Sequence, residues 1–258
     1  MRSDRPAYKQ LADLLRQQIL GGELAPGAPL PSETRLRQEL GVSRNTVRLA
    51  VQLLRSEGHV TTEHGRGTYV RERPQVRRLG PDRYRADVAP EGSETSFTRD
   101  QGIDWADYRL DKVFREIPAT GLLVDLLDVP EGTPLLERHF TFYARGEPQQ
   151  ISISVYPLAQ VEGTPVADPD NEPWAGGNIA QLASIGITVT RVEESVTARM
   201  PMPDEAETLV MDPGVPVIVI GRRMFDGDRP VEAADIVIPA DRVALDYVID
   251  LGGHRPGG

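Results

Sequence analysis

Two short helix-forming stretches separated by three residues constrain the fold of this chain more than any other feature. Ser32 is placed to cap a helix that continues to Leu40, and Gly41 then ends it. Ser43 is placed to cap the next helix, over about residues 44–57. Two helices joined by so short a turn are typical of a helix-turn-helix.

The flanking residues complete a small domain around this helix pair. A preceding helix over about residues 8–20 carries apolar side chains at three- and four-residue spacing. These apolar residues are Tyr8, Leu11, Leu15 and Ile19. Two short strands, residues 59–63 and 68–70, follow the helix pair and are joined by a tight glycine turn. This order predicts a winged helix-turn-helix over residues 1–70.

The second helix of the pair begins with side chains suited to reading DNA. Its apolar stripe consists of Val47, Ala50, Val51 and Leu54. Arg44, Asn45 and Arg48 stand at its N-terminal end, the end with which recognition helices contact base edges. Arginine suits guanine, and asparagine suits adenine or phosphate. The alternative is a solvated helix face, but the capped helix pair and the wing favour DNA binding.

The net charge of −10 is divided unevenly along the chain. Residues 1–78 contain 14 Lys and Arg against 8 Asp and Glu, whereas residues 79–258 contain 15 against 31. A basic first part on an acidic remainder indicates that only the first part meets a polyanion. Chance variation in surface composition is the alternative explanation.

The second half of the chain contains an internal repeat. Residues 126–157 and 208–239 align without a gap at a constant offset of 82 residues. The matching pairs are Gly132 with Gly214, Pro134 with Pro216, Pro148 with Pro230, and Pro157 with Pro239. Each copy has the pattern of a helix end followed by a strand hairpin, so we expect one antiparallel sheet of pseudo-twofold character.

Further elements are expected around these two units. Helices are expected near residues 120–127, 178–185 and 204–210, with a long strand near residues 187–200. Before the repeat, the charged and proline-interrupted residues 71–78 are expected to begin a linker. The arginines of that stretch either touch phosphates or are simply solvated.

Polar residues interrupt the expected strands. Alternation places Ser152 and Ser154 on the face opposite the isoleucines of the same strand. Arg138 and Glu194 each fall on an otherwise apolar strand face, and Glu232 falls on the serine side in the second copy. A buried charge must be paired, hydrated or bound to a ligand. A structural salt bridge, such as one between Glu194 and Arg138 or Arg199, is therefore the alternative to a ligand site.

The stretch LPSETRLRQELGVSRNTVRLAVQLLRSEGHVTTEHGRGTYV, within residues 7–70, closely resembles the GntR family of regulators. The resemblance implies that the start of the recognition helix faces the operator and that the wing turn reaches the minor groove. Thr34 replaces an arginine common in the family, and Arg35 follows about 100° further round the helix. The expected DNA-contacting residues are Thr34, Arg35, Ser43, Arg44, Asn45, Thr46, Arg48, His64, Gly65 and Arg66.

The segments DVPEGTPLLERHF, ARGEPQQISISVYPL, EESVTARMPMPDEA and RPVEAADIVIPADR resemble the UTRA ligand-binding domain of the HutC subfamily. The resemblance implies a domain that has a fold similar to that of chorismate lyase and that senses small molecules. The expected effector-site residues are Arg138, Ser152, Ser154, Glu194, Glu232 and Arg242. Phe140 stands where the family often has a second arginine, and Val243 stands where it often has a tyrosine. Both departures make a phosphosugar effector less expected, because a pair of arginines is what binds a phosphate group.

Together these patterns predict an α+β chain with two functional parts. The winged helix-turn-helix covers residues 1–70, a linker 71–94, an antiparallel-sheet effector-binding and dimerisation domain 95–250, and a flexible tail 251–258. We expect a transcription regulator, by default a repressor, that binds a palindromic operator as a homodimer. A small polar or acidic effector is expected to release it. The alternatives are a constitutive plasmid- or phage-type repressor whose C-terminal part only dimerises, and a lyase-like enzyme.

Several other classes are disfavoured by the sequence. The absence of cysteine excludes disulfides and thiolate metal sites, and the four histidines complete no metal-binding cluster. No cofactor is expected, and no nucleophile-elbow or phosphate-loop motif indicates catalysis. No apolar run is long enough to span a membrane. The N-terminus lacks the pattern of a secretory signal, so a cytoplasmic location is expected.

Overall fold

The computed structural model describes residues 5–63, 67–72, 77–79, 84 and 95–247. The chain forms two compact units, one of residues 1–74 with 200–216 and one of residues 75–199 with 217–258. The expected wing turn (residues 64–66), much of the expected linker and the expected tail (residues 251–258) lie outside the described residues.

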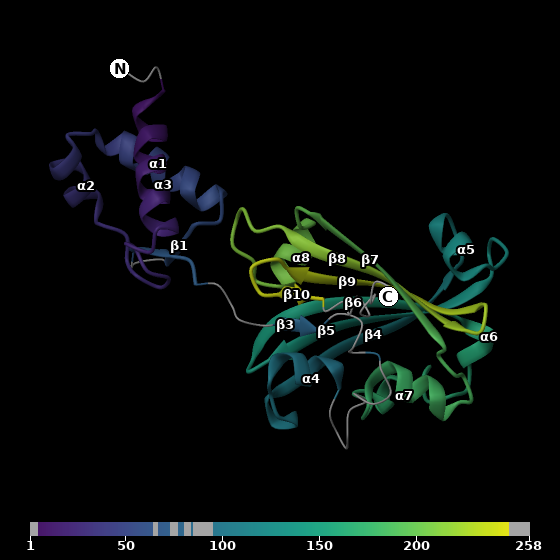
Figure 1. The fold of residues 1–258 in the computed structure, drawn as a ribbon. Helices are drawn as coiled ribbons and strands as arrows, with labels where there is room; N and C mark the ends of the chain where they lie inside the picture. Colours follow the sequence, from purple (N-terminus) through teal and green to yellow (C-terminus); the bar gives the residue numbers. More distant parts are fainter. Residues whose placement is uncertain (1–4, 64–66, 73–76, 80–83, 85–94, 248–258) are drawn as a thin grey trace, which may run out of the picture. The chain divides into compact units, whose positions relative to one another are not determined.

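The first unit begins with three helices and a two-stranded antiparallel ladder (Figure 1), and a helix from later in the chain is added to them. Its elements are α1 (Ala7–Leu20), α2 (Glu33–Leu40), α3 (Arg44–Ser56), β1 (Val60–Glu63), β2 (Gly67–Val70) and α8 (Pro203–Thr208). The Ser32 and Ser43 hydroxyls accept hydrogen bonds from the backbone N–H groups of Arg35 (3.2 Å) and Thr46 (3.1 Å). Gly41 ends α2 with a left-handed φ of 65°. The predicted helix-turn-helix and its caps are confirmed.

Apolar packing and one ion pair hold α3 against α1. The buried core of this unit consists of Leu11, Ala12, Leu15, Leu30, Leu36, Val47, Ala50, Leu54, Val60 and Val70. Arg16 on α1 donates to the Glu57 carboxylate after α3, with Nε to Oε2 at 2.9 Å and Nη2 to Oε1 at 2.8 Å. Since the apolar stripe of α3 faces this core, its polar face remains at the surface.

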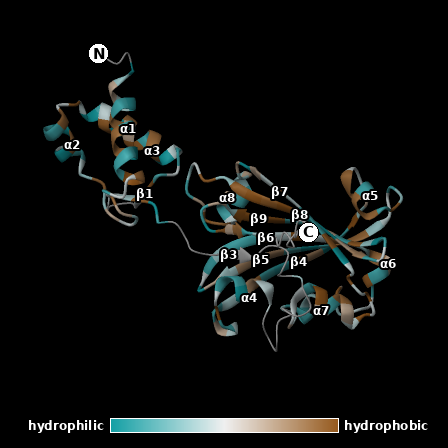
Figure 2. Ribbon diagram, viewed as in Figure 1, coloured by the Kyte–Doolittle hydropathy of each residue, from teal (hydrophilic) through white to brown (hydrophobic). Residues whose placement is uncertain are grey.

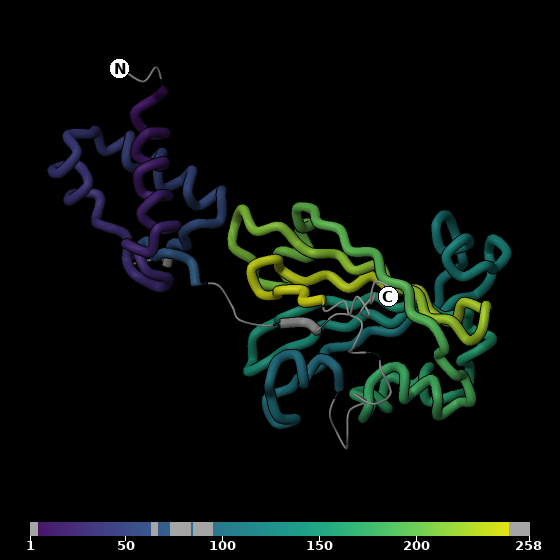
Figure 3. Tube along the Cα trace, in the orientation of Figure 1, coloured from purple at the N-terminus to yellow at the C-terminus, as the bar shows by residue number. Residues whose placement is uncertain are grey.

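A six-stranded antiparallel sheet forms the second unit, in the order β4-β5-β6-β9-β8-β7. The strands are β4 (Tyr108–Pro118), β5 (Pro134–Ala144), β6 (Glu147–Pro157), β7 (Arg191–Arg199), β8 (Val217–Asp226) and β9 (Arg229–Pro239). The hairpins β5–β6 and β8–β9 lie side by side through the pairing of β6 with β9 (Figure 3). The predicted repeat is confirmed, because β6 and β9 begin and end at positions that differ by the offset of 82 residues.

The edges of the sheet differ from the sequence expectation. Strand β4 was not predicted, and it lies at an edge, where half-buried and exposed residues alternate along most of its length. The strand expected near residues 187–200 is shorter and forms the opposite edge as β7. Residues 77–79, expected to be linker, form strand β3 (Arg77–Leu79), which pairs in parallel with β10 (Ala244–Asp246). That partner is remote in sequence, so no local pattern indicates the strand.

Helices pack on both faces of the sheet, α5 on one face and α7 on the other. The helices are α4 (Ser96–Gln101), α5 (Leu122–Leu127), α6 (Leu158–Val161) and α7 (Gly177–Ser184). Val155 faces the cluster that includes Leu127 of α5, whereas its neighbour Tyr156 faces the cluster that includes Leu182 of α7. Figure 2 shows hydrophobic residues along β8 and β9, which are neighbouring strands of the sheet. The face toward α7 carries the predicted polar strand residues.

Candidate functional site

The N-terminal end of α3 presents three exposed polar side chains, those of Arg44, Asn45 and Arg48. Arg44 Nε lies 3.1 Å from a Glu33 carboxylate oxygen on α2. Within the described part of the chain, Arg48 has no ion-pair partner. The guanidinium of Arg48 is thus available to an external acceptor, and that of Arg44 is held beside it by a mostly exposed ion pair.

The other residues expected at DNA occupy the helix cap, α2 and the wing. Ser43 and Thr46 contact each other through their hydroxyls at 2.8 Å, so both take part in the cap of α3. Thr34 and Arg35 are exposed on α2, where Arg35 donates to Glu39 at 2.7 Å. His64, Gly65 and Arg66 lie outside the described residues.

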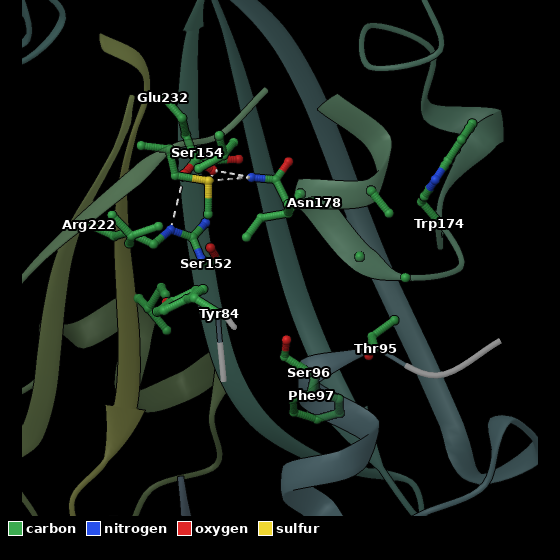
Figure 4. A pocket seen from close by; sticks show the side chains of 18 of the residues that line it. Tyr84, Thr95, Ser96, Phe97, Ser152, Ser154, Trp174, Asn178, Arg222 and Glu232 are labelled. Atoms are coloured by element: carbon green, nitrogen blue, oxygen red, sulfur yellow. Dashed lines mark hydrogen bonds and ion pairs between the residues drawn. The ribbon is translucent and has the colours of Figure 1, made fainter. Parts of the chain in front are cut away.

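A cavity of about 760 Å³ lies on the α7 side of the sheet in the second unit. In Figure 4, side chains from β6, β8, β9, α4 and α7 surround one space, among them Ser152, Arg222, Glu232 and Asn178. The backbone of Gly176 and Gly177, at the start of α7, also lines it. A volume of this size is typical of sites for drug-sized ligands.

A buried ion pair stands at one end of the cavity. Arg222 donates to both carboxylate oxygens of Glu232, from Nη2 at 2.8 Å and from Nε at 3.0 Å. The Tyr156 hydroxyl (2.9 Å) and the Asn178 amide (2.7 Å) donate to the same carboxylate. Burial lowers the pKa of Arg222, but Glu232 and Tyr84 together raise it by more, so the net direction is upward. Burial, assisted by Glu232, raises the pKa of the Tyr156 hydroxyl.

A second buried ion pair joins Arg138 on β5 to Glu172, which precedes α7. Their side chains are 3% and 8% exposed. Arg138 Nη1 also donates to Gln181 Oε1 at 2.8 Å, and the guanidinium lies 4.8 Å from the ring centre of Phe140. Carboxylate, amide and aromatic ring together compensate the desolvation of this arginine. Burial and then the Glu172 charge raise the pKa of Tyr108, which also lines the cavity.

Glu194 and Tyr84 form a third polar contact at the cavity. The Tyr84 hydroxyl donates to Glu194 Oε1 at 2.5 Å. Glu194 is paired in register with Arg222 across β7 and β8. The carboxylate therefore lies in a polar part of the cavity, and the salt bridge to Arg138 considered from the sequence is replaced by the pair of Arg138 with Glu172.

The structure brings five of the six expected effector-site residues to the cavity. These are Arg138, Ser152, Ser154, Glu194 and Glu232. Arg242 is not among the lining residues, because it lies in the turn after β9, where its guanidinium donates to the Pro148 carbonyl. Their role as effector contacts stays a prediction.

The sequence analysis missed several lining residues, among them both partners in the buried ion pairs, Arg222 and Glu172. Arg222 lies between Ile220 and Met224 on an otherwise apolar face, as Arg138 does in its strand, so the same criterion applied to the second repeat finds it. Glu172 lies in an irregular segment between a short 3₁₀ helix and α7. No periodicity marks it, so only the tertiary structure reveals its contact with Arg138.

Within the described ranges, no helix combines the length and hydrophobicity needed to cross a bilayer. In the same part of the chain, no three potential metal-binding side chains are grouped together.

A winged helix-turn-helix unit and a cavity-bearing sheet unit in one chain define a ligand-responsive DNA-binding protein. Residues 7–70 match the family model of bacterial regulatory proteins of the gntR family, and residues 113–244 match the UTRA domain. The chain therefore belongs to the GntR family of transcriptional regulators with a UTRA effector-binding domain. Since that family consists of transcriptional regulators, the lyase-like alternative is not supported.

Relatives along nearly the whole chain agree with this assignment. The chain is 31% identical over 248 residues to an uncharacterized HTH-type transcriptional regulator of Streptomyces coelicolor, covering 94% of this chain and 92% of the relative. It is 28% identical to the histidine utilization repressor of Pseudomonas putida, covering 93% and 91%. A crystal structure of a GntR-family transcriptional regulator matches with 36% identity and a TM-score of 0.67, covering 96% and 99%.

The Glu232 cluster predicts a large difference between two glutamate substitutions. Glu232→Gln should lower the free energy of unfolding by about 3–5 kcal/mol, because it leaves Arg222 buried without its counterion. Glu193→Gln, which affects a much more exposed ion pair with Arg223, should cost about 1 kcal/mol or less. Chemical denaturation of both variants measures the difference. Equal stabilities would show that the Glu232 cluster is not a structural element.

Proposed function

We propose that this regulator is a homodimeric repressor that binds a palindromic operator in the cytoplasm and is released by a small molecule bound in the cavity. The observation that carries the proposal is the presence in one chain of an exposed, arginine-bearing recognition helix and a cavity lined by buried charged residues. The cavity favours a ligand-responsive repressor over one whose C-terminal part only dimerises.

The start of α3 supports sequence-specific binding. Arg48 projects from an exposed position one turn after Arg44, so both can reach base edges when the helix lies in the major groove. Thr34 and Arg35 on α2, together with the caps Ser43 and Thr46, are placed for backbone contacts. In this proposal the wing residues keep their predicted minor-groove role.

The number of base pairs needed for specific binding supports a dimer. A single winged helix reads only a few base pairs, whereas two copies on paired half-sites supply the specificity that a genome requires. The sheet offers surfaces for pairing, because β4 and β7 are its edges and carry Val113 (63% exposed) and Val196 (43% exposed). Exposed strand edges with apolar residues are unusual in a stable monomer.

Ligand binding controls the repressor by shifting its conformational equilibrium. A molecule in the cavity favours the dimer geometry that it binds more tightly, and this geometry separates the recognition helices from their half-sites. Its effect on operator affinity cannot exceed its preference between the two states, typically about 1–3 kcal/mol.

The recognition-helix role predicts a sequence-dependent loss. Arg48→Ala should weaken binding to the cognate operator by about 1–3 kcal/mol and weaken binding to random DNA much less. Fluorescence anisotropy at fixed salt concentration measures both affinities, with Arg55→Ala at the opposite end of α3 as the control. An equal loss on both DNAs would show that Arg48 contacts only phosphate.

The dimer predicts a mass of twice 28.4 kDa for the full chain in solution. Sedimentation equilibrium without DNA measures it, because pairing through the sheet units does not depend on the operator. A single species of monomer mass at micromolar concentrations would contradict the proposed assembly.

The effector role predicts that Glu194→Gln separates sensing from DNA binding. Compounds that raise the melting temperature of the wild type should also release its operator, and the variant should lose this release. Its affinity for the operator without ligand should change by less than about twofold, because Glu194 lies in the sheet unit. A variant that unfolds or no longer binds DNA would identify Glu194 as a structural residue.

A further inference from the structure

Building on the proposed sensing function, we propose that the cavity selects an effector without negative charge, and that Glu172 enforces this selection as the internal counterion of Arg138. The ligand class is a neutral molecule with an apolar ring or chain at one end and hydrogen-bonding groups at the other. This narrows the polar or acidic effector expected from the sequence.

The charges around the cavity balance. Among the residues that the structure describes, three cations and three anions line it: Arg138, Arg191, Arg222, Glu172, Glu194 and Glu232. Each arginine already contacts a carboxylate: Arg138 that of Glu172, Arg222 that of Glu232, and Arg191 that of Glu193. To pair with Arg138 or Arg222, an anionic ligand would have to displace the Glu172 or Glu232 carboxylate from a buried ion pair.

Glu172 is held firmly in its position. One carboxylate oxygen accepts from Arg138 Nη2, and the other accepts from the Trp174 backbone N–H at 3.0 Å. The Glu172 backbone carbonyl accepts from Lys112 Nζ at 2.6 Å. The carboxylate thus occupies the place that the acid group of an anionic ligand would take on Arg138. Charge-assisted hydrogen bonds in a buried site are strong, so displacement is unfavourable.

Arg138 keeps one donor for a neutral ligand. Its Nε–H is buried and has no acceptor among the residues that the structure describes. Buried donors are normally paired, so this group is suited to an oxygen of the bound molecule. A hydroxyl, ether or carbonyl oxygen would satisfy it without disturbing the ion pair with Glu172. Ser152 and Asn178 provide further polar groups along the cavity wall.

Another part of the cavity wall is aromatic. Phe97 from α4 lies with its ring centre 5.1 Å from that of Phe142 and 5.6 Å from that of Tyr108. Phe140 continues the cluster 5.9 Å from Phe142, and all four residues line the cavity. Such a wall favours a flat ring or an apolar chain over a sugar phosphate.

Phosphate titrations of the full chain test the role of Glu172. The melting temperature is measured in sodium phosphate against sodium chloride of equal ionic strength. The wild type should show no difference between the salts. Glu172→Gln should gain a saturable rise of about 2 °C or more, because its Arg138 can bind the anion. Glu172→Asp keeps the negative charge and should show no gain. Glu137→Gln, which removes the partner of Arg115, an arginine outside the cavity lining, should also show no gain.

Two results would overturn the inference: saturable stabilisation of the wild type by phosphate, or a folded Glu172→Gln without any gain. Should this variant not fold, the titrations of the wild type and Glu172→Asp still decide. Calorimetry then compares the affinities of the wild type for phenylacetamide and phenylacetate, two ligands of similar shape that differ in charge. Tighter binding of the carboxylate would also overturn the proposal.

These outcomes are separable from those of the sensing function. Suppose that phosphate does not stabilise the wild type and that no compound that stabilises it weakens its operator binding. This result would contradict the proposed sensing function but not the inference about charge. A wild type that binds phosphate and is released by it would support sensing and contradict the role of Glu172.

Discussion

The pairing of β6 with β9 is the interaction on which the second unit depends. It joins two hairpins of the same pattern into one sheet, with Ser154 opposite Ala234 and Ser152 opposite Ile236. The alternate residues of four strands then face one space, so polar groups from both repeats meet there. Arg138 and Glu232 lie on different hairpins, so without this pairing they would not line the same cavity.

Burial of charge decides what this space can accept. Each hairpin contributes one buried arginine, and the fold supplies each with a carboxylate: Glu232 from the neighbouring strand and Glu172 from the segment before α7. A buried arginine without its counterion is strongly unfavourable. The same contacts that stabilise the unit therefore set the charge of the cavity, which links folding and ligand selectivity.

Much of the fold was predictable because its signals are local. Ser32, Gly41 and Ser43 define the helix boundaries through bonds within one turn, and the proline and glycine pattern of the repeat locates both hairpins. Strand β4 and the pairing of β3 with β10 were not predicted. An edge strand lacks the continuous apolar pattern of a central one, and a partner more than 150 residues away leaves no local trace.

By itself the sequence determined the two-part organisation, the exposed arginines of α3 and the strand face on which Arg138, Ser154 and Glu232 lie, since helix caps and strand alternation are properties of neighbouring residues. Only the tertiary structure decided which charges pair. Glu172 reaches Arg138 across 34 residues, and Arg242 turns away to the Pro148 carbonyl. Ion pairs and cavities depend on side chains from distant segments, whose approach is set by packing and not by spacing along the chain.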